Sequence, residues 1–88
     1  MSKIIFRMEI FKEGGEYVSL CSDLNISSYG STIKEAKNSL IEAVEAFIET
    51  CEEIGSLNEV LEEGGFHKIR GRWEPREPVV EQKVIVPA

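Results

Sequence analysis

The sequence predicts an α+β fold, a three- to four-stranded antiparallel sheet with one long helix packed on one face. Apolar side chains alternate with a period of two as far as Tyr29 and repeat with a period of about 3.6 from Ile33 onward. A glycine pair, Gly14-Gly15, interrupts the alternating part and supplies the positive φ angles that a hairpin turn needs. These features predict a β-meander followed by an amphipathic helix.

Three strands are expected before the helix, at residues 3–11, 17–21 and 26–29. In the first of them one face carries Ile4, Phe6, Met8 and Ile10. In the second, Val18 and Leu20 are expected to face the core. The turn between the second and third strands falls at Asp23-Leu24-Asn25, since Asp and Asn stabilise turns through side-chain hydrogen bonds.

The helix is expected from Ile33 to about Ile54. Thr32 is the expected N-cap, whose hydroxyl accepts from the Glu35 N–H while the Thr32 N–H donates in return to the Glu35 carboxylate, and Gly30 allows a sharp turn before it. Gly55 fits the left-handed residue that ends such a helix. The apolar stripe consists of Ile33, Ala36, Leu40, Ala43, Val44, Phe47, Ile48, Cys51 and Ile54. A second capping box, Ser56 to Glu59, predicts a short helix as far as Glu63.

The remaining residues lack a sustained period. Residues 66–77 are expected to form an extended connection, and residues 79–86 a last strand, which gives the element order βββααβ. The chain is expected to be a single domain over 1–88, with its core in 3–63 and its tail and last strand in 66–87. A chain of 88 residues buries only about 60% of its unfolded surface, so we expect a homo-oligomer with the last strand paired along a sheet edge or with a second protomer.

Composition restricts the cellular location and the class of partner expected for this chain. The net charge is −6, but residues 31–63 alone carry two basic and nine acidic side chains. This acidic middle repels phosphate backbones and favours a basic protein partner over nucleic acid. No apolar run is long enough to span a membrane and no signal sequence is seen, so a cytoplasmic protein is expected. Cys21 and Cys51 lack metal-site spacing and are expected to be reduced, buried thiols.

The candidate partner-binding residues are glutamates on the polar side of the long helix together with the single tryptophan: Glu42, Glu45, Glu49, Glu52 and Trp73. The glutamates fit either a solvated helix face or a docking face. Arg70-Gly71-Arg72-Trp73 fits a clamp for single-stranded RNA, in which the aromatic ring stacks on a base. In the alternative, Trp73 packs on the core edge or on a dimer mate and the arginines pair with Glu49, Glu52 or Glu62.

No catalytic, metal-binding or cofactor-binding residues are predicted. A metal-dependent nuclease needs several carboxylates converging on Mg²⁺, whereas the expected strands carry only Glu9 and Glu16, with Asp23 in a turn. His67 is the single histidine and has no Cys or Ser at a plausible spacing, so it is expected at the surface. An enzyme is the least favoured class of function.

The order and spacing of these motifs resemble the HicB-like antitoxins. The resemblance rests on Gly14-Gly15, Asp23-Leu24, the segment Gly30-Ser31-Thr32 with Glu35-Ala36, and the prolines before the last expected strand. The chain departs from the family pattern at Ser22-Asp23-Leu24-Asn25-Ile26, where a proline-bearing turn is common. It also has too few residues after Val79 for the ribbon-helix-helix or helix-turn-helix module that many members append.

The resemblance implies a partial RNase H-like fold and a non-catalytic antitoxin without direct DNA binding. It implies a partner, a small basic HicA-like ribonuclease that cleaves mRNA and is neutralised when the antitoxin covers its active site. The acidic helix face would then speed association through electrostatic steering. The alternative is an orphan homo-oligomeric structural or adaptor module without a toxin partner.

Overall fold

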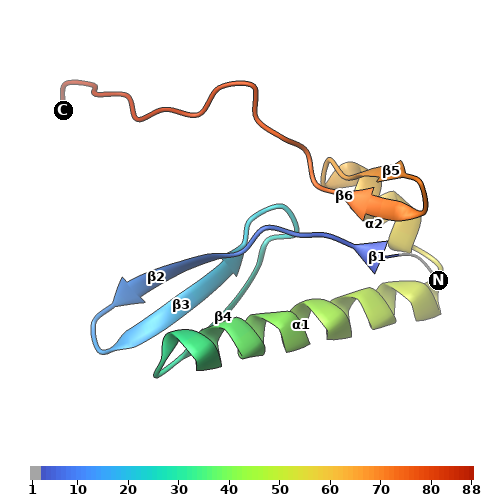
Figure 1. Cartoon of the computed structure of the whole chain (residues 1–88), viewed down its shortest axis with the longest axis horizontal. Coiled ribbons are helices and arrows are strands. Elements are labelled where there is room, and N and C mark those ends of the chain that lie inside the picture. The colour runs from blue at the N-terminus through green and yellow to red at the C-terminus, as the bar shows by residue number, and fades with distance from the viewer. Residues whose placement is uncertain (1–2) are drawn as a thin grey trace.

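The computed structural model describes residues 3–88 and confirms the α+β class. Two small sheets and a long helix make up the fold, and the chain after the last strand extends away from it (Figure 1). The elements are β1 (Lys3–Ile4), β2 (Glu9–Glu13), β3 (Glu16–Cys21), β4 (Ile26–Gly30), α1 (Ile33–Ile54), α2 (Leu57–Glu63), β5 (His67–Ile69) and β6 (Arg72–Glu74).

The predicted antiparallel meander is present as the sheet β2-β3-β4, and α1 packs on one of its faces. Gly14 takes a φ of 62° in the β2–β3 turn, a value that glycine adopts without steric cost. The register sets Phe11 opposite Val18 and Val18 opposite Tyr29. Directly opposite residues lie on the same face of an antiparallel sheet, so this register fixes which side chains share a face.

The face of β3 that meets the helix differs from the expectation. Ser19 and Cys21 are fully buried against α1, whereas Val18 and Leu20 lie on the other face. The Ser19 hydroxyl donates a 2.7 Å hydrogen bond to the Ala36 carbonyl, which satisfies the buried oxygen. Period-two alternation identifies two faces, and in this strand the more apolar face is not the one covered by the helix.

Helix α1 has the expected limits, with one correction to its cap. The Glu35 N–H donates to Thr32 Oγ1 at 3.0 Å as predicted, but the Glu35 carboxylate accepts from Ser31 N–H rather than from Thr32. Gly55 is left-handed, with a φ of 80°, and ends the helix in a Schellman motif. The capping box predicted at the start of α2 is wrong, because the Ser56 side chain makes no capping hydrogen bond.

The expected extended connection over 66–77 is instead a hairpin, β5–β6. Its turn residues Arg70 and Gly71 both have positive φ, 49° and 79°, as a type I′ turn requires. The first expected strand is correspondingly divided into two. Lys3–Ile4 pairs in parallel with Arg72–Trp73, and only from Glu9 does the chain join the meander. The observed order is therefore ββββααββ rather than βββααβ.

The core consists of two adjoining clusters. Cys21, Leu40 and Val44 form one between the meander and α1, and Leu61, Phe66 and Trp73 form the other between α2 and the β5–β6 hairpin. Phe6 and Leu24 pack against both clusters and connect them. The ends of the predicted apolar stripe lie outside this core, since Ile33 and Ile54 are exposed.

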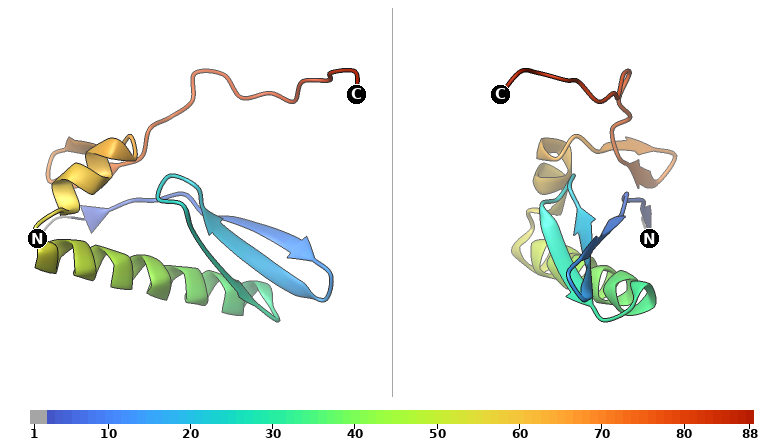
Figure 2. Two further views of the ribbon diagram at one scale, coloured as in Figure 1. Left: turned by 180° about the vertical axis from the view of Figure 1, so that it is seen from behind. Right: turned by 90° about the vertical axis from the view of Figure 1, so that its left-hand side faces the viewer.

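The expected last strand is absent from the fold. Residues 75–88 form no strand or helix, and the apolar side chains from Val79 to Val86 are 69–100% exposed. Two views show this tail on the side of the meander away from α1 (Figure 2). An isolated strand gains no ladder hydrogen bonds, so the β-branched residues alone do not fix its conformation.

Both cysteines are free and buried, as predicted. Burial, and to a smaller extent the Asp23 carboxylate, raises the pKa of the Cys21 thiol above its ordinary value of 9.0.

The raised pKa of Cys21 predicts a loss of stability at alkaline pH. Above the ordinary thiol value the unfolded chain ionises while the folded chain keeps the proton, so the free energy of unfolding falls as the pH rises. The destabilisation caused by Cys21→Ala is therefore expected to shrink with rising pH. Urea denaturation of both proteins across the alkaline range measures this difference, and a pH-independent difference would contradict the assignment.

Candidate functional site

One side of α1 carries a continuous row of carboxylates. Glu42, Glu45, Glu49 and Glu52 are all exposed, as predicted, on the side of the helix opposite the buried Leu40 and Val44. Steps of three and four residues keep side chains on one side of a helix, and the same steps add Glu35 and Glu53 to the row. We call this set the acidic stripe: Glu35, Glu42, Glu45, Glu49, Glu52 and Glu53.

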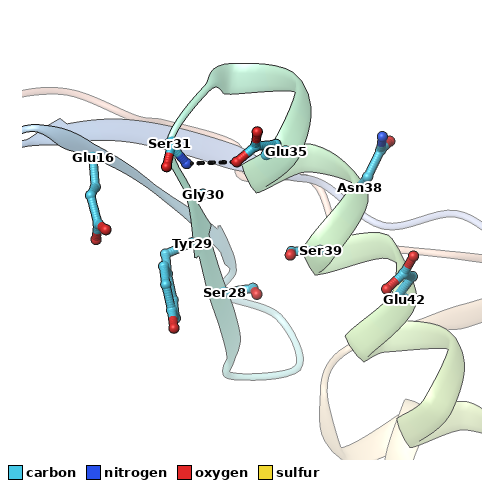
Figure 3. Close-up of a pocket in the computed structure, with 9 residues that line it drawn as sticks. All are labelled: Glu16, Ser28, Tyr29, Gly30, Ser31, Glu35, Asn38, Ser39 and Glu42. Atoms are coloured by element: carbon cyan, nitrogen blue, oxygen red, sulfur yellow. Dashed lines mark hydrogen bonds between the residues drawn. The ribbon is translucent and has the colours of Figure 1, made fainter.

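The first two residues of the acidic stripe also line a groove between β4 and α1. This β4–α1 groove has a volume of about 590 Å³. Figure 3 shows Glu16 and Tyr29 on its strand side and Glu35 and Glu42 on its helix side. The remaining lining residues are small or amide-bearing, namely Ser28, Gly30, Ser31, Asn38 and Ser39. The groove is therefore a polar, acidic continuation of the stripe onto the edge of the sheet.

Small residues bring the helix close to the strand at this groove. A Cβ atom on Gly30 would lie 2.5 Å from the Ala36 nitrogen and 2.6 Å from the Glu35 Cβ, distances that real side chains do not tolerate. Gly30 is thus required by the close approach of α1, which adds a packing reason to the turn expected from the sequence. The short Ser28 and Ser39 side chains leave the adjacent space open.

The acidic stripe lacks compensating cations within residues 3–88. The ion pairs in this part of the chain use Asp23, Glu74 and Glu77, and none reaches a glutamate of the stripe or of the groove. Glu45, Glu49 and Glu53 follow one another at four-residue steps, where like charges repel by about 0.2–0.5 kcal/mol per pair.

The last turn of α1 has no basic residue although the helix dipole is negative there, and it carries Glu52 and Glu53. The charges of the stripe therefore oppose helix stability. Positions that break a local stability rule are those expected of functional sites.

Trp73 is not part of this surface. Its side chain is 5% exposed and packs with Leu61 and Phe66, while Lys68 Nζ lies 5.8 Å from the ring centroid. A buried ring is not available to stack on a base, so the structure does not support the RNA clamp. The prediction that Trp73 contacts a partner is corrected: it is a core residue, as the alternative interpretation held.

The arginines beside Trp73 have different partners from those expected. Arg72 pairs with Glu74 at 3.1 Å, within its own strand, and no ion pair joins Arg70 or Arg72 to Glu49, Glu52 or Glu62 among residues 3–88. Arg70 occupies the β5–β6 turn. These positions leave the acidic stripe free of intramolecular neutralisation by this segment.

Two further hollows lie outside the groove. One, of about 510 Å³, lies at the α1–α2 junction and is lined by Glu52 together with Gly55, Leu57, Asn58 and Glu59. The other, of about 630 Å³, surrounds an ion-pair cluster of Arg7, Asp23, Arg76 and Glu77. In the part of the chain from residue 3 to 88, no three His, Cys, Asp or Glu side chains are placed to hold a metal ion. His67 is exposed on β5, as predicted.

Sequence reasoning found four members of the acidic stripe and missed the groove. Glu35 follows the same three- and four-residue spacing, but its local pattern predicts only a capping residue. Glu16 and Tyr29 join the site through the register of β3 with β4, which no local pattern reveals. Comparisons with models of protein families, with curated proteins and with solved structures give no match. None of the helices in residues 3–88 has the length and apolar character to cross a membrane.

Proposed function

We propose that this protein is a non-catalytic binding protein of the HicB-like antitoxin type that occludes a small basic mRNA-cleaving ribonuclease. The observation that carries the proposal is the acidic stripe on α1, which has no ion-pair partner among residues 3–88 and continues into the β4–α1 groove. A cationic protein surface placed on the stripe removes the repulsion between neighbouring glutamates and gains charge-assisted contacts. The same charge repels DNA and RNA backbones, so the proposed partner is the basic ribonuclease itself.

Two surfaces of the site suit different parts of such a partner. The stripe follows several turns of α1 and matches an extended basic surface. The groove lies at β4, an edge strand whose outer backbone groups are unpaired in the sheet, and its carboxylates come from both sides. A basic loop or strand of the partner fits this position, because edge strands accept added strands. We further propose a cytoplasmic location, in which Cys21 and Cys51 remain reduced thiols.

Charge reversal tests the stripe directly. The variant E42K/E45K/E49K is expected to lower the association rate with the basic protein encoded by the adjacent open reading frame by about tenfold or more at low salt, since steering supplies gains of this size. The effect is expected to diminish at higher salt, because the screening length falls to about 8 Å at physiological ionic strength. Stopped-flow or biosensor kinetics over a salt series measure both quantities.

The matched control is E59K/E62K/E63K on α2, which changes the net charge by the same amount without substituting a residue of the stripe. This control is expected to keep most of the wild-type association rate. Equal slowing in the two variants would show that net charge, and not the stripe, drives association. Failure of the wild-type protein to bind the neighbouring gene product, or to restore growth when the two are co-expressed, would overturn the antitoxin proposal.

A second candidate function is a homo-oligomeric structural or adaptor module without a toxin. The exposed apolar tail favours it. The apolar side chains from Val79 to Val86 are exposed to water, and covering them with a second copy would stabilise them. The two functions are compatible in one molecule, since the tail and α1, the helix that carries the acidic stripe, lie on opposite sides of the meander (Figure 1).

A further inference from the structure

Among residues 3–88, no helix or strand covers one face of the meander. Phe11, Val18 and Tyr29 form a cross-strand row on the face away from α1, and Leu20 lies next to Val18 along the same strand face. Phe11 is 48% exposed and Tyr29 65% exposed. We call these four residues the open face. Large apolar side chains gathered in one row on a sheet indicate a surface that another element covers.

The tail is the second uncovered apolar surface of the chain. Residues 79–86 alternate so that Val80, Gln82, Val84 and Val86 share one side of an extended chain. This side has no charge, whereas the other side carries both Glu81 and Lys83. The segment contains no proline, and its β-branched residues favour an extended conformation. It therefore has the pattern of a strand with one face to bury.

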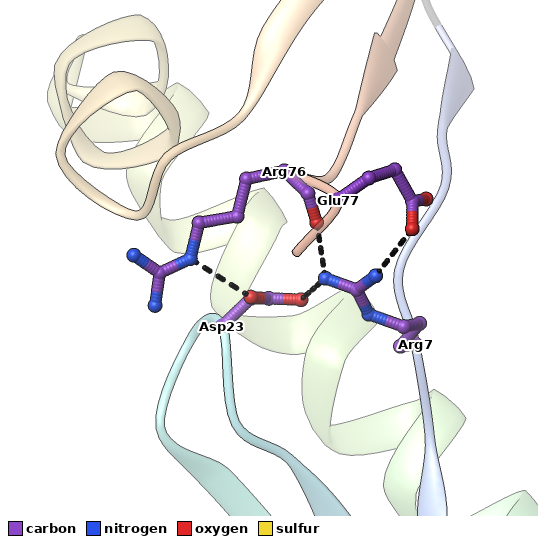
Figure 4. Close-up of polar contacts among 4 residues, drawn as sticks. All are labelled: Arg7, Asp23, Arg76 and Glu77. Carbon is purple, nitrogen blue, oxygen red and sulfur yellow. Dashed lines mark hydrogen bonds and ion pairs between the residues drawn. The ribbon is translucent and has the colours of Figure 1, made fainter. Parts of the chain in front are cut away.

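The start of the tail is fixed to the domain. Arg7 Nη1 lies 2.9 Å from Glu77 Oε2, and Arg7 Nη2 lies 3.4 Å from Asp23 Oδ2 and donates to the Arg76 carbonyl (Figure 4). The Asp23 side chain is 5% exposed and also faces Arg76 Nε at 3.8 Å. From this anchor the last ten residues can extend by up to about 33 Å, longer than any strand of the meander. The tail thus leaves the domain at a defined point and is long enough to extend along a whole strand of the meander.

We infer that the open face binds the Val79–Val86 segment of a second copy of this chain, in a reciprocal two-fold dimer. Each copy carries one uncovered sheet face and one uncovered tail segment, so a closed exchange buries all four apolar surfaces at once. Within one chain the tail stays clear of its own sheet, since all its apolar residues are at least 69% exposed.

The oligomeric mass in solution tests the inference with paired variants of the full chain. Wild-type protein is expected to have twice the 9.9 kDa chain mass by light scattering at micromolar concentration. Val84→Asp, on the uncharged side of the tail, is expected to weaken the dimer by about a hundredfold or more because it buries a charge. Its neighbour Ile85→Asp lies on the opposite side and is expected to leave the dimer intact. A monomeric wild-type protein, or equal effects of the two substitutions, would overturn the inference.

The open face is tested with Phe11→Asp, at a half-exposed position outside the β4–α1 groove, with circular dichroism to verify folding. This variant is expected to be monomeric alone, and its mixture with Val84→Asp is expected to recover dimers, because one intact tail and one intact face remain in the mixed pair. A dimeric Phe11→Asp protein would show tail–tail pairing instead.

Disulfide trapping identifies which chain supplies the tail. A mixture of the Phe11→Cys and Val84→Cys proteins is expected to form cross-linked heterodimers. Preferential closure within single chains of the double variant would show that the tail covers its own face and would overturn the proposed exchange. Toxin binding is measured separately at the acidic stripe, so the failure of one proposal is distinguishable from the failure of the other.

Discussion

Leu40→Ala is expected to abolish or nearly abolish stable folding. Leu40 is fully buried and contributes, with Cys21 and Val44, to the cluster between α1 and the meander. Removing such a side chain destabilises a protein by about 2–5 kcal/mol through lost transfer energy and the residual cavity. Domains are stable by only about 5–15 kcal/mol, and small ones lie near the lower limit. Thermal and urea denaturation followed by far-UV circular dichroism measures the effect.

Ile54→Ala is the matched control for Leu40→Ala. It removes an aliphatic side chain of the same helix that is 72% exposed, so the change in unfolding free energy is expected to stay within about 0.5 kcal/mol. An unchanged melting temperature in Leu40→Ala, or equal losses in the two variants, would contradict the packing of α1 on the meander.

The elements that the sequence predicted correctly are those with strong local signals. The meander follows from alternation and Gly14, and α1 follows from its apolar period, the Thr32 cap and Gly55. The missed elements depend on pairing between distant residues. Strand β1 covers only Lys3–Ile4 of the described residues and exists through its parallel ladder to β6. The β5–β6 turn uses Arg70-Gly71, which lacks the Asn-Gly or Asp-Gly pattern that announces such a turn.

The candidate site shows the same division. The glutamates of the acidic stripe follow from helical spacing, because every third or fourth position returns to one side of the helix. The contribution of Glu16 depends on strand register, and the burial of Trp73 depends on α2 and the C-terminal hairpin folding over it. An aromatic residue flanked by arginines has the same local pattern in an RNA clamp and at a core edge, so the sequence alone does not separate the two.

Among the features that depend on pairing between distant residues, the register of β3 has the largest effect on the proposed surfaces. With Ser19 and Cys21 toward α1, the apolar Val18 and Leu20 lie on the uncovered face beside Phe11. The hydrogen bond from Ser19 to the Ala36 carbonyl fixes this choice, because the opposite register would leave the hydroxyl on the other face. The same one-residue choice therefore joins α1 to the sheet and creates the surface proposed for the second copy.

Trp73→Ala is expected to destabilise the protein by about 3–5 kcal/mol, the range for a buried aromatic side chain. Trp73 connects β6 to Leu61 of α2 and Phe66, so its loss removes the largest side chain of the second cluster. Trp73→Phe keeps most of the buried surface and is expected to lose less stability. Because the ring lies in the core, the folded Trp73→Phe protein is expected to bind the basic partner at the wild-type rate. Denaturation and association kinetics of the two variants measure these quantities, and slower association by a fully folded Trp73→Phe protein would return Trp73 to the binding surface.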